Sequence, residues 1–205
     1  MLHSPTPLAD GFSSLIAPFE IALLERMPAP VVGLSPDGRI AHLNPAWHAF
    51  GVANGARSSG AGGDIGDALL HSTPPVLRPF YEELFADAIA TGKVREHDYE
   101  CSSPEQRRTF RMRVHPCASG ALVIVHSLLR EAPHAGNACP PLERLYRDAR
   151  GLVVQCANCR RVRRATRPST EPASATWDWV PEYVAHMPAR TSHAICMLCA
   201  QFYYG

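Results

Sequence analysis

The sequence has no strong net charge and no long run of apolar residues. Its formal charge is +1 over 205 residues, which gives no overall field to draw the chain onto nucleic acid or an anionic membrane. No stretch approaches the roughly 18 uninterrupted apolar residues of a membrane-spanning helix. The first residues also lack the positive start, apolar run and cleavage site of a secretory signal. We therefore expect a cytoplasmic protein whose charged surfaces are local.

The sequence also lacks the short motifs that mark common catalytic sites. It contains no phosphate-cradling glycine loop, no nucleophile elbow and no kinase or cyclase segment. We therefore expect a protein that is not an enzyme. It does contain seven cysteines, and cytoplasmic cysteines stay reduced unless a metal or a catalytic role uses them. The cysteines thus favour metal binding.

Residues 1–27 are predicted to form a polar leader and an amphipathic helix. The helix is expected over residues 13–27, where apolar residues recur at helical spacing before Pro28 and Pro30. Its apolar face either packs on its own domain or contacts a second copy of the chain, because periodicity alone does not name the partner. A homodimer through this helix is one of these two expectations.

The patterns in residues 28–130 predict an α+β domain. A hairpin over residues 31–43, with a turn at its Asp-Gly dipeptide, precedes a helical turn beginning at Asn44-Pro45 and a longer helix over residues 76–90. Three strand-like runs follow: 94–101, 109–115 and 121–127. This order makes an antiparallel sheet with its helices gathered on one face. The Gly-rich and Ser-rich residues 54–66 are predicted to form a loop.

Two segments of this region resemble a known family. The run LLERMPAPVVGLSPDGRIAHLNPAWHAF resembles the opening of a PAS domain, and the later helix and meander complete the PAS order of elements. The segment YECSSPEQRRTFRMRVHP also resembles a proteobacterial PAS subfamily with a Cys-x-Ser-Pro-x-x-Arg-Arg stretch. The matching residues are Cys101, Ser103, Pro104, Arg107 and Arg108. The resemblance implies a PAS sensor domain.

The resemblance also implies where a sensor ligand would bind, since the pocket of a PAS fold lies between its helices and the concave sheet face. The residues it points to are Phe80, Leu84, Phe110, Met112 and Val114. Ordinary core packing explains the same residues, because apolar side chains at regular spacing need no ligand. His71, His97 and His126 are conceivable haem ligands, although a single histidine is more often exposed or hydrogen bonded. The ligand of the PAS domain therefore stays unknown.

Beyond a Pro-, Gly- and Ala-containing linker over residues 131–151, residues 152–205 hold two Cys-x-x-Cys pairs. These pairs are Cys156 with Cys159 and Cys196 with Cys199. A two-residue spacer lets both sulfurs of a tight turn reach one ion, and four thiolates close a tetrahedral shell. The 36 residues between the pairs exceed the roughly 15–20 of a compact zinc ribbon. We predict a zinc-finger-like module with structural zinc; an iron–sulfur cluster, a redox disulfide pair or no metal remain alternatives.

The second pair belongs to a longer resemblance. The run from Ser192 through His193 to Cys199 is similar to a Ser/Thr-His-x-x-Cys-x-x-Cys ending that often follows PAS modules of that subfamily and of some sensor kinases. A Pro-, Ser- and Thr-rich insert over residues 166–176 departs from it. Four cysteines already fill the coordination shell of the metal. We therefore expect His193 to contact a cysteine ligand from outside that shell, or to be an ordinary packing residue.

Five arginines follow the first cysteine pair: Arg160, Arg161, Arg163, Arg164 and Arg167. Such a run beside a zinc module can contact phosphates, while a solvated face or a protein-binding surface explains it as well. The resemblance implies non-catalytic signal transduction, in which the PAS domain senses a ligand, a redox state or a partner and passes that state to a separate protein. The alternative is a PAS-regulated nucleic-acid-binding regulator that uses the arginines.

Overall fold

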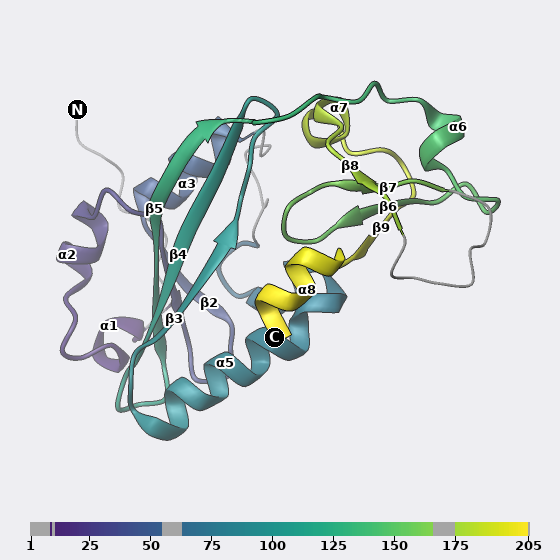
Figure 1. Cartoon of the computed structure of the whole chain (residues 1–205). Helices are drawn as coiled ribbons and strands as arrows, with labels where there is room; N and C mark the ends of the chain where they lie inside the picture. The colour runs from purple at the N-terminus through teal and green to yellow at the C-terminus, as the bar shows by residue number, and fades with distance from the viewer. Residues whose placement is uncertain (1–8, 10, 55–62, 166–174, 205) are drawn as a thin grey trace. The chain divides into compact units, whose positions relative to one another are not determined.

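The computed structural model of the chain describes residues 9, 11–54, 63–165 and 175–204. These residues fall into two compact units (Figure 1). The first unit consists of the described parts of residues 1–74, 78–99 and 110–129, and the second of the described parts of residues 75–77, 100–109 and 130–205. No helix within the described ranges has both the length and the apolar character that crossing a membrane requires.

The first unit is built on a five-stranded sheet with the strand order β2-β1-β5-β4-β3. Its strands are β1 (Val31–Leu34), β2 (Ile40–Leu43), β3 (Arg95–Glu100), β4 (Gln106–Pro116) and β5 (Leu122–Pro133). Strand β1 pairs antiparallel with both β2 and β5, so the last strand returns to the centre of the sheet. The predicted α+β class is confirmed, with its order of hairpin, helices and three-stranded meander.

Two helices of the first unit, α3 (Pro45–Ala53) and α5 (Arg78–Thr91), pack on one face of this sheet. The ring of Phe50 on α3 lies 5.3 Å from that of Phe110 on β4, and Phe80 on α5 lies 4.5 Å from His97 on β3. His97 shares a face with Tyr99, two residues along the strand, and Tyr99 stacks on Phe110. The shorter α4 (Leu69–Ser72) precedes α5. These helices follow the predicted one-sided arrangement.

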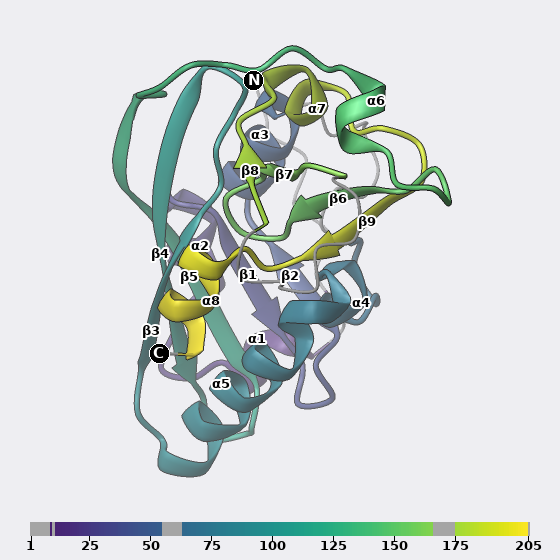
Figure 2. The same ribbon diagram turned by 45° about the vertical axis from the view of Figure 1, so that its right-hand side comes forward.

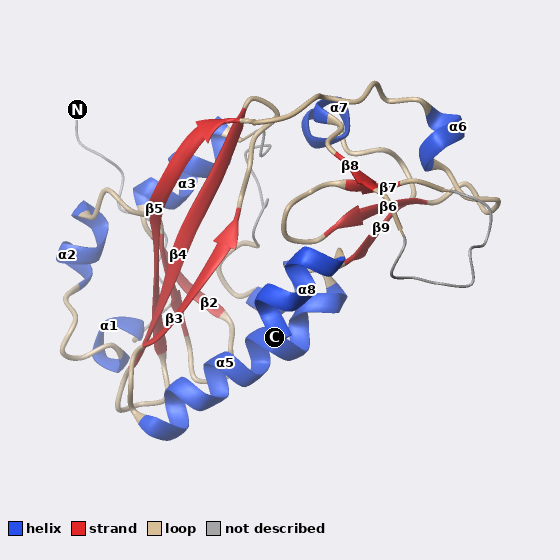
Figure 3. Cartoon of the chain, in the orientation of Figure 1, coloured by secondary structure: helices blue, strands red, loops and turns tan. Residues whose placement is uncertain are grey.

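The N-terminal segment covers the opposite face (Figure 3). Instead of the predicted single helix over residues 13–27 it forms two short helices, α1 (Phe12–Leu15) and α2 (Ile21–Arg26). Pro18 lies between them, and a proline lacks the N–H and the free space that a continuous helix needs. Both helices still bury apolar side chains against the sheet in a cluster of Phe12, Ile16, Leu24, Val31, Ala41, Val123 and Val125. The apolar face of this segment therefore packs on its own domain.

Asn44 holds this N-terminal segment to the start of α3. Its side chain is fully buried, and its Oδ1 accepts hydrogen bonds from the backbone N–H groups of Val31 (2.9 Å) and Trp47 (3.0 Å). Its Nδ2 donates to the carbonyl oxygens of Leu24 (3.1 Å) and Ala29 (3.0 Å), among others. One side chain thus caps α3 and satisfies backbone groups that the end of α2 would leave open.

The second unit contains a sheet of four short strands in the order β8-β7-β6-β9. The strands are β6 (Val153–Cys156), β7 (Val162–Arg163), β8 (Trp177–Asp178) and β9 (Thr191–Ala194). The helices are α6 (Glu143–Tyr146), α7 (Pro181–Ala185), α8 (Met197–Tyr204) and a 3-10 turn, η1 (Pro75–Leu77). Strand β6 pairs antiparallel with β7 on one side and parallel with β9 on the other. Figure 2 shows β6 between these two strands.

The apolar core of the second unit is small. It consists of Tyr146, Val153, Val162, Val180 and Tyr183. Tyr146 falls within the predicted linker, yet it is only 1% exposed and its hydroxyl donates to Asp178 at 3.0 Å. A buried tyrosine whose hydroxyl has an acceptor is an ordinary core residue, and the whole predicted linker, residues 131–151, falls in the second unit. The predicted loop and insert, residues 54–66 and 166–176, lie mostly outside the described residues.

Candidate metal centre

The four predicted cysteine ligands lie together in the second unit. The sulfur atoms of Cys156, Cys159, Cys196 and Cys199 are all within 4.8 Å of one another, and no residue of the four is more than 9% exposed. The Cys159 and Cys196 sulfurs are 3.7 Å apart. A tetrahedral ion with metal–sulfur distances of about 2.3 Å separates its sulfurs by about 3.8 Å. The donor set and its spacing therefore fit a zinc ion.

The first pair is placed by the turn between β6 and β7. Cys156 is the last residue of β6, and its N–H donates to the Arg161 carbonyl at 2.8 Å while Arg160 N–H donates to the Cys156 carbonyl at 3.1 Å. Arg160 has a φ of 60°, in the left-handed region that costs a residue with a Cβ atom about 1–2 kcal/mol. This tight turn is what directs the sulfurs of Cys156 and Cys159 to the same point.

The second pair is placed by the junction of β9 and α8. Cys196 immediately precedes α8, and Cys199 lies in its first turn. Because β9 runs parallel to β6, its last residue, Ala194, pairs with Cys156. The long separation between the two cysteine pairs is thus taken up by β7, β8, α7 and β9. A parallel strand needs such a crossover connection, and this explains why the spacing exceeds that of a compact ribbon.

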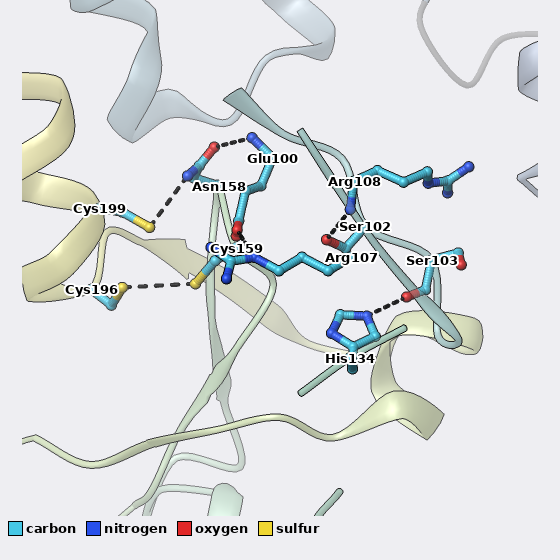
Figure 4. A network of polar contacts seen from close by, with 10 residues as sticks. All are labelled: Glu100, Ser102, Ser103, Arg107, Arg108, His134, Asn158, Cys159, Cys196 and Cys199. Atoms are coloured by element: carbon cyan, nitrogen blue, oxygen red, sulfur yellow. Dashed lines mark hydrogen bonds and ion pairs between the residues drawn. The ribbon is translucent and has the colours of Figure 1, made fainter. Parts of the chain in front are cut away.

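Two hydrogen bonds reach the sulfurs from neighbouring groups. The Cys196 N–H donates to the Cys156 sulfur at 3.4 Å. Nδ2 of Asn158 donates to the Cys199 sulfur at 3.3 Å (Figure 4). Donors aimed at the ligand atoms favour their negatively charged form, and metal ligands in proteins commonly have such partners. Asn158 was not predicted as a site residue, although it stands between the cysteines of the first pair.

The thiols of the cluster strongly affect one another. Hydrogen bonds from the thiols of Cys159, Cys196 and Cys199 lower the pKa of Cys156. The hydrogen bond with Cys156 is the largest cause that raises the pKa of Cys159 and of Cys199. The thiolates of Cys156 and Cys196 are therefore favoured at the expense of those of Cys159 and Cys199. A divalent cation relieves this conflict, because it stabilises all four thiolates at once.

His193 lies on β9, where it pairs in register with Gln155 of β6. Burial is the main cause that lowers its pKa, and the charge of Arg160 lowers it further. Among the described residues, the hydrogen bonds to the sulfurs from groups other than thiols come from the Cys196 N–H and the Asn158 side chain. The expectation that His193 supports a cysteine ligand or simply packs stays a prediction.

The arginines after the first pair have two different environments. Arg164 makes two hydrogen bonds to Asp178, at 2.6 and 3.1 Å. Within the described residues, no acidic side chain forms an ion pair with Arg160, Arg161 or Arg163. Arg167 lies outside the described residues. The sequence run is therefore divided into one arginine paired with Asp178 and three without an acidic partner among the described residues.

The residues that the PAS resemblance assigns to a pocket lie in the first unit. Phe110, Met112 and Val114 are buried side chains of β4, whereas Phe80 and Leu84 of α5 are half-buried. Ring contacts extend from Phe80 and Phe110 to His97 and Phe50. The assignment of these residues to a ligand pocket stays a prediction.

The histidines of the first unit differ in exposure. A hydrogen bond of 2.8 Å joins Nδ1 of His126 to the Tyr99 hydroxyl. Burial lowers the pKa of His126 to about 4, and burial does the same to His97. His71 is exposed. His97 and His126 are therefore neutral at neutral pH, and their uncharged rings belong to the aromatic packing beneath α3 and α5.

The comparisons with known proteins leave the family open. No protein-family model and no curated protein matches the chain. A domain of an HTR-like protein from Haloarcula marismortui matches 51% of this chain and 100% of its own, with 16% identity and a TM-score of 0.37. The photoactive yellow protein domain of the sensor histidine kinase Ppr from Rhodospirillum centenum matches 54% of this chain and 94% of its own, with 15% identity and a TM-score of 0.37. At these values neither likeness assigns a family or an activity.

Proposed function

We propose that this chain is a non-catalytic, cytoplasmic signal-transduction protein with a PAS sensor domain and a structural zinc module. The observation that supports the zinc assignment is the buried set of four sulfurs that lie within 4.8 Å of one another, two of them 3.7 Å apart. The PAS assignment is supported by the strand order β2-β1-β5-β4-β3 together with the sequence resemblance. With no catalytic motif in the sequence, the output is a contact with a separate protein.

Zinc is favoured by the chemistry of the donors. Four thiolates leave no open position for a substrate, as in structural rather than catalytic zinc sites. The second unit buries only a small apolar cluster, so it has little hydrophobic stabilisation of its own. Zinc binding contributes on the order of 10 kcal/mol or more to the folding of isolated zinc modules. The metal therefore supplies much of the stability of this unit.

The signal is a ligand, a redox change or a partner that acts on the first unit. A signal of this kind shifts the population between two arrangements only if it binds them unequally. The aromatic and histidine side chains between the sheet and its helices are where a ligand would act, because they form the part of the domain that the PAS resemblance assigns to the pocket.

A nucleic-acid-binding regulator is the second candidate function. It is favoured by one observation, the absence of acidic partners for Arg160, Arg161 and Arg163 within the described residues. Phosphate binding by these arginines would weaken steeply as salt is added. Binding of a short DNA or RNA duplex that is unchanged between low and high salt, or no binding at all, would remove this candidate.

The decisive experiment measures the metal content and native mass of the purified protein by elemental analysis and native mass spectrometry. One zinc per chain is expected, with loss of zinc in the double variant Cys196→Ser and Cys199→Ser. A matched double variant, Cys101→Ser and Cys139→Ser, replaces two half-buried cysteines outside the cluster and should retain the zinc. Iron in place of zinc would redirect the proposal to redox or gas sensing. A metal-free protein would contradict it and favour a thiol switch.

A further inference from the structure

The side chain of Asn158 uses both ends of its amide inside the second unit. Its Nδ2 donates to the Cys199 sulfur, while its Oδ1 accepts from the backbone N–H of Glu100 at 2.9 Å (Figure 4). The same Oδ1 accepts from the Tyr203 hydroxyl at 3.2 Å. Asn158 is only 6% exposed. A thiolate only accepts and a backbone N–H only donates, so this arrangement fixes which end of the amide faces which group.

Glu100 is the last residue of β3. It begins the segment 100–109, called the turn below, which connects β3 to the first residues of β4 and is closed by its own hydrogen bonds. Within residues 100–109, the Cys101 N–H donates to the Arg108 carbonyl and the Arg108 N–H donates to the Ser102 hydroxyl. The Arg107 side chain pairs with the Glu100 carboxylate at 2.6 Å. Outside the turn, a ring nitrogen of His134 lies 3.0 Å from the Ser103 carbonyl. Because these bonds link both sides of the turn, fixing Glu100 helps to fix the whole segment.

We propose that Asn158 couples metal binding at the four cysteines to the order of the turn over residues 100–109. The proposal rests on the zinc site of the proposed function. With metal bound, the Cys199 thiolate is fixed in place and is a strong acceptor, and this orients Asn158 toward the Glu100 N–H. Without metal, the sulfur is a mobile thiol and a weak acceptor. Asn158 then loses the partner that orients it, and the Glu100 N–H loses its acceptor.

The turn is covalently continuous with β3 and β4, the strands that carry His97 and Phe110. Coupling between two sites is reciprocal, since each changes the binding free energy of the other by the same amount. A change that reaches residues 100–109 along these strands therefore alters zinc affinity, and zinc alters the turn. On this account the metal site is a participant in signalling as well as a structural element.

The test measures zinc affinity, by competition with a chelator, and amide hydrogen exchange at Glu100 and Arg108 in the full chain with and without zinc. In the wild type, zinc removal should speed exchange at Glu100 at least tenfold. Asn158→Ala should weaken zinc binding about tenfold and leave Glu100 exchanging fast even when zinc is saturating. Asn137→Ala is the matched control, because Asn137 is exposed and should change neither quantity.

Asn158→Asp separates the two ends of the side chain. It keeps an oxygen for the Glu100 N–H and the Tyr203 hydroxyl but loses the N–H that donates to Cys199. We expect weaker zinc binding, with Glu100 still protected once zinc is saturating, in contrast to Asn158→Ala. A wild type that binds zinc while Glu100 exchanges equally fast with and without it would overturn the coupling alone. A wild type that binds no zinc would overturn the proposed function, and the coupling with it.

Discussion

The two units of this chain reach a stable fold by different means. The first buries apolar side chains on both faces of its sheet, with Val31, Ile124 and Val114 essentially inaccessible to solvent. The second buries one small apolar cluster beside four cysteines. Hydrophobic burial is a property of the chain alone, whereas a thiolate cluster is stable only with a cation. The comparison teaches that the two units should respond differently to metal, to acid and to single substitutions.

The largest expected difference follows removal of the metal. Chelation at neutral pH should unfold the second unit, because its metal contributes on the order of 10 kcal/mol or more, and should leave the first unit folded. Amide exchange resolved by residue measures this, with Val153 and Val162 reporting the second unit and Val31 and Val123 the first. Equal loss of protection in both units would show that they are not independent in this respect.

Asn44→Ala should be the most damaging single substitution in the first unit. It removes several buried hydrogen bonds at once and leaves backbone groups without partners, which should cost about 4 kcal/mol of unfolding free energy. Urea denaturation followed by first-unit amides gives the value. Asn54→Ala serves as the control: this exposed residue has a side-chain bond to the Phe50 carbonyl, and its loss should cost less than about 1 kcal/mol.

Acid should destabilise the first unit through His126. Burial lowers the pKa of this histidine from 6.5 to about 4 in the folded state. The unfolded state therefore binds a proton first, so stability falls as the pH drops from about 6.5 to about 4, by roughly 3 kcal/mol in total. The dependence is measured as urea midpoints of first-unit amides across this range, with zinc released from all samples.

His126→Gln should remove the part of that pH dependence that His126 contributes, about half, because glutamine does not titrate. His71→Gln, which replaces an exposed histidine, should leave it unchanged. His97 carries a similarly lowered pKa and should account for the slope that remains. A slope that is the same in all three proteins would mean that carboxylates, and not buried histidines, set the acid response of this unit.

The smallest expected effect is a gain in the second unit. Arg160→Gly places a residue without a Cβ atom at a φ of 60° and should stabilise the metal-bound turn by up to about 1 kcal/mol, since the flexibility of glycine in the unfolded chain offsets part of the relief. The apparent zinc affinity should rise correspondingly. Arg161→Gly, at the next position, should not produce this gain; an equal gain there would point to charge as the cause.

The elements that could be predicted from the sequence are those with a local signal. The hairpin turn at Gly38, the alternating strand around Phe110 and the two cysteine pairs were all evident from spacing. The N-terminal helix was wrong as a single element, because its apolar periodicity outweighed the presence of Pro18. Local sequence patterns thus predict which segments form helices and strands, but they predict less well where a helix is interrupted.

The parts of the site that could not be predicted depend on contacts across the chain. Asn158 bonds to the backbone N–H of Glu100, and a backbone group is the same for every residue type, so nothing in the sequence marks that partner. Tyr146 was assigned to a linker because its acceptor, Asp178, is far away in the sequence. No local signal distinguishes the five arginines from one another, yet Arg164 pairs with the same aspartate.

The parallel pairing of β6 with β9 also has a consequence for the timing of folding. The first cysteine pair leaves the ribosome well before the second, and it can hold an ion only loosely until β9 and the start of α8 have been synthesised. Closing this long connection has an entropic cost that precedes the gain from the metal. The second unit should therefore fold late, when all strands of the first unit's sheet have already been synthesised. Until then its cysteines can be oxidised or can bind other metals.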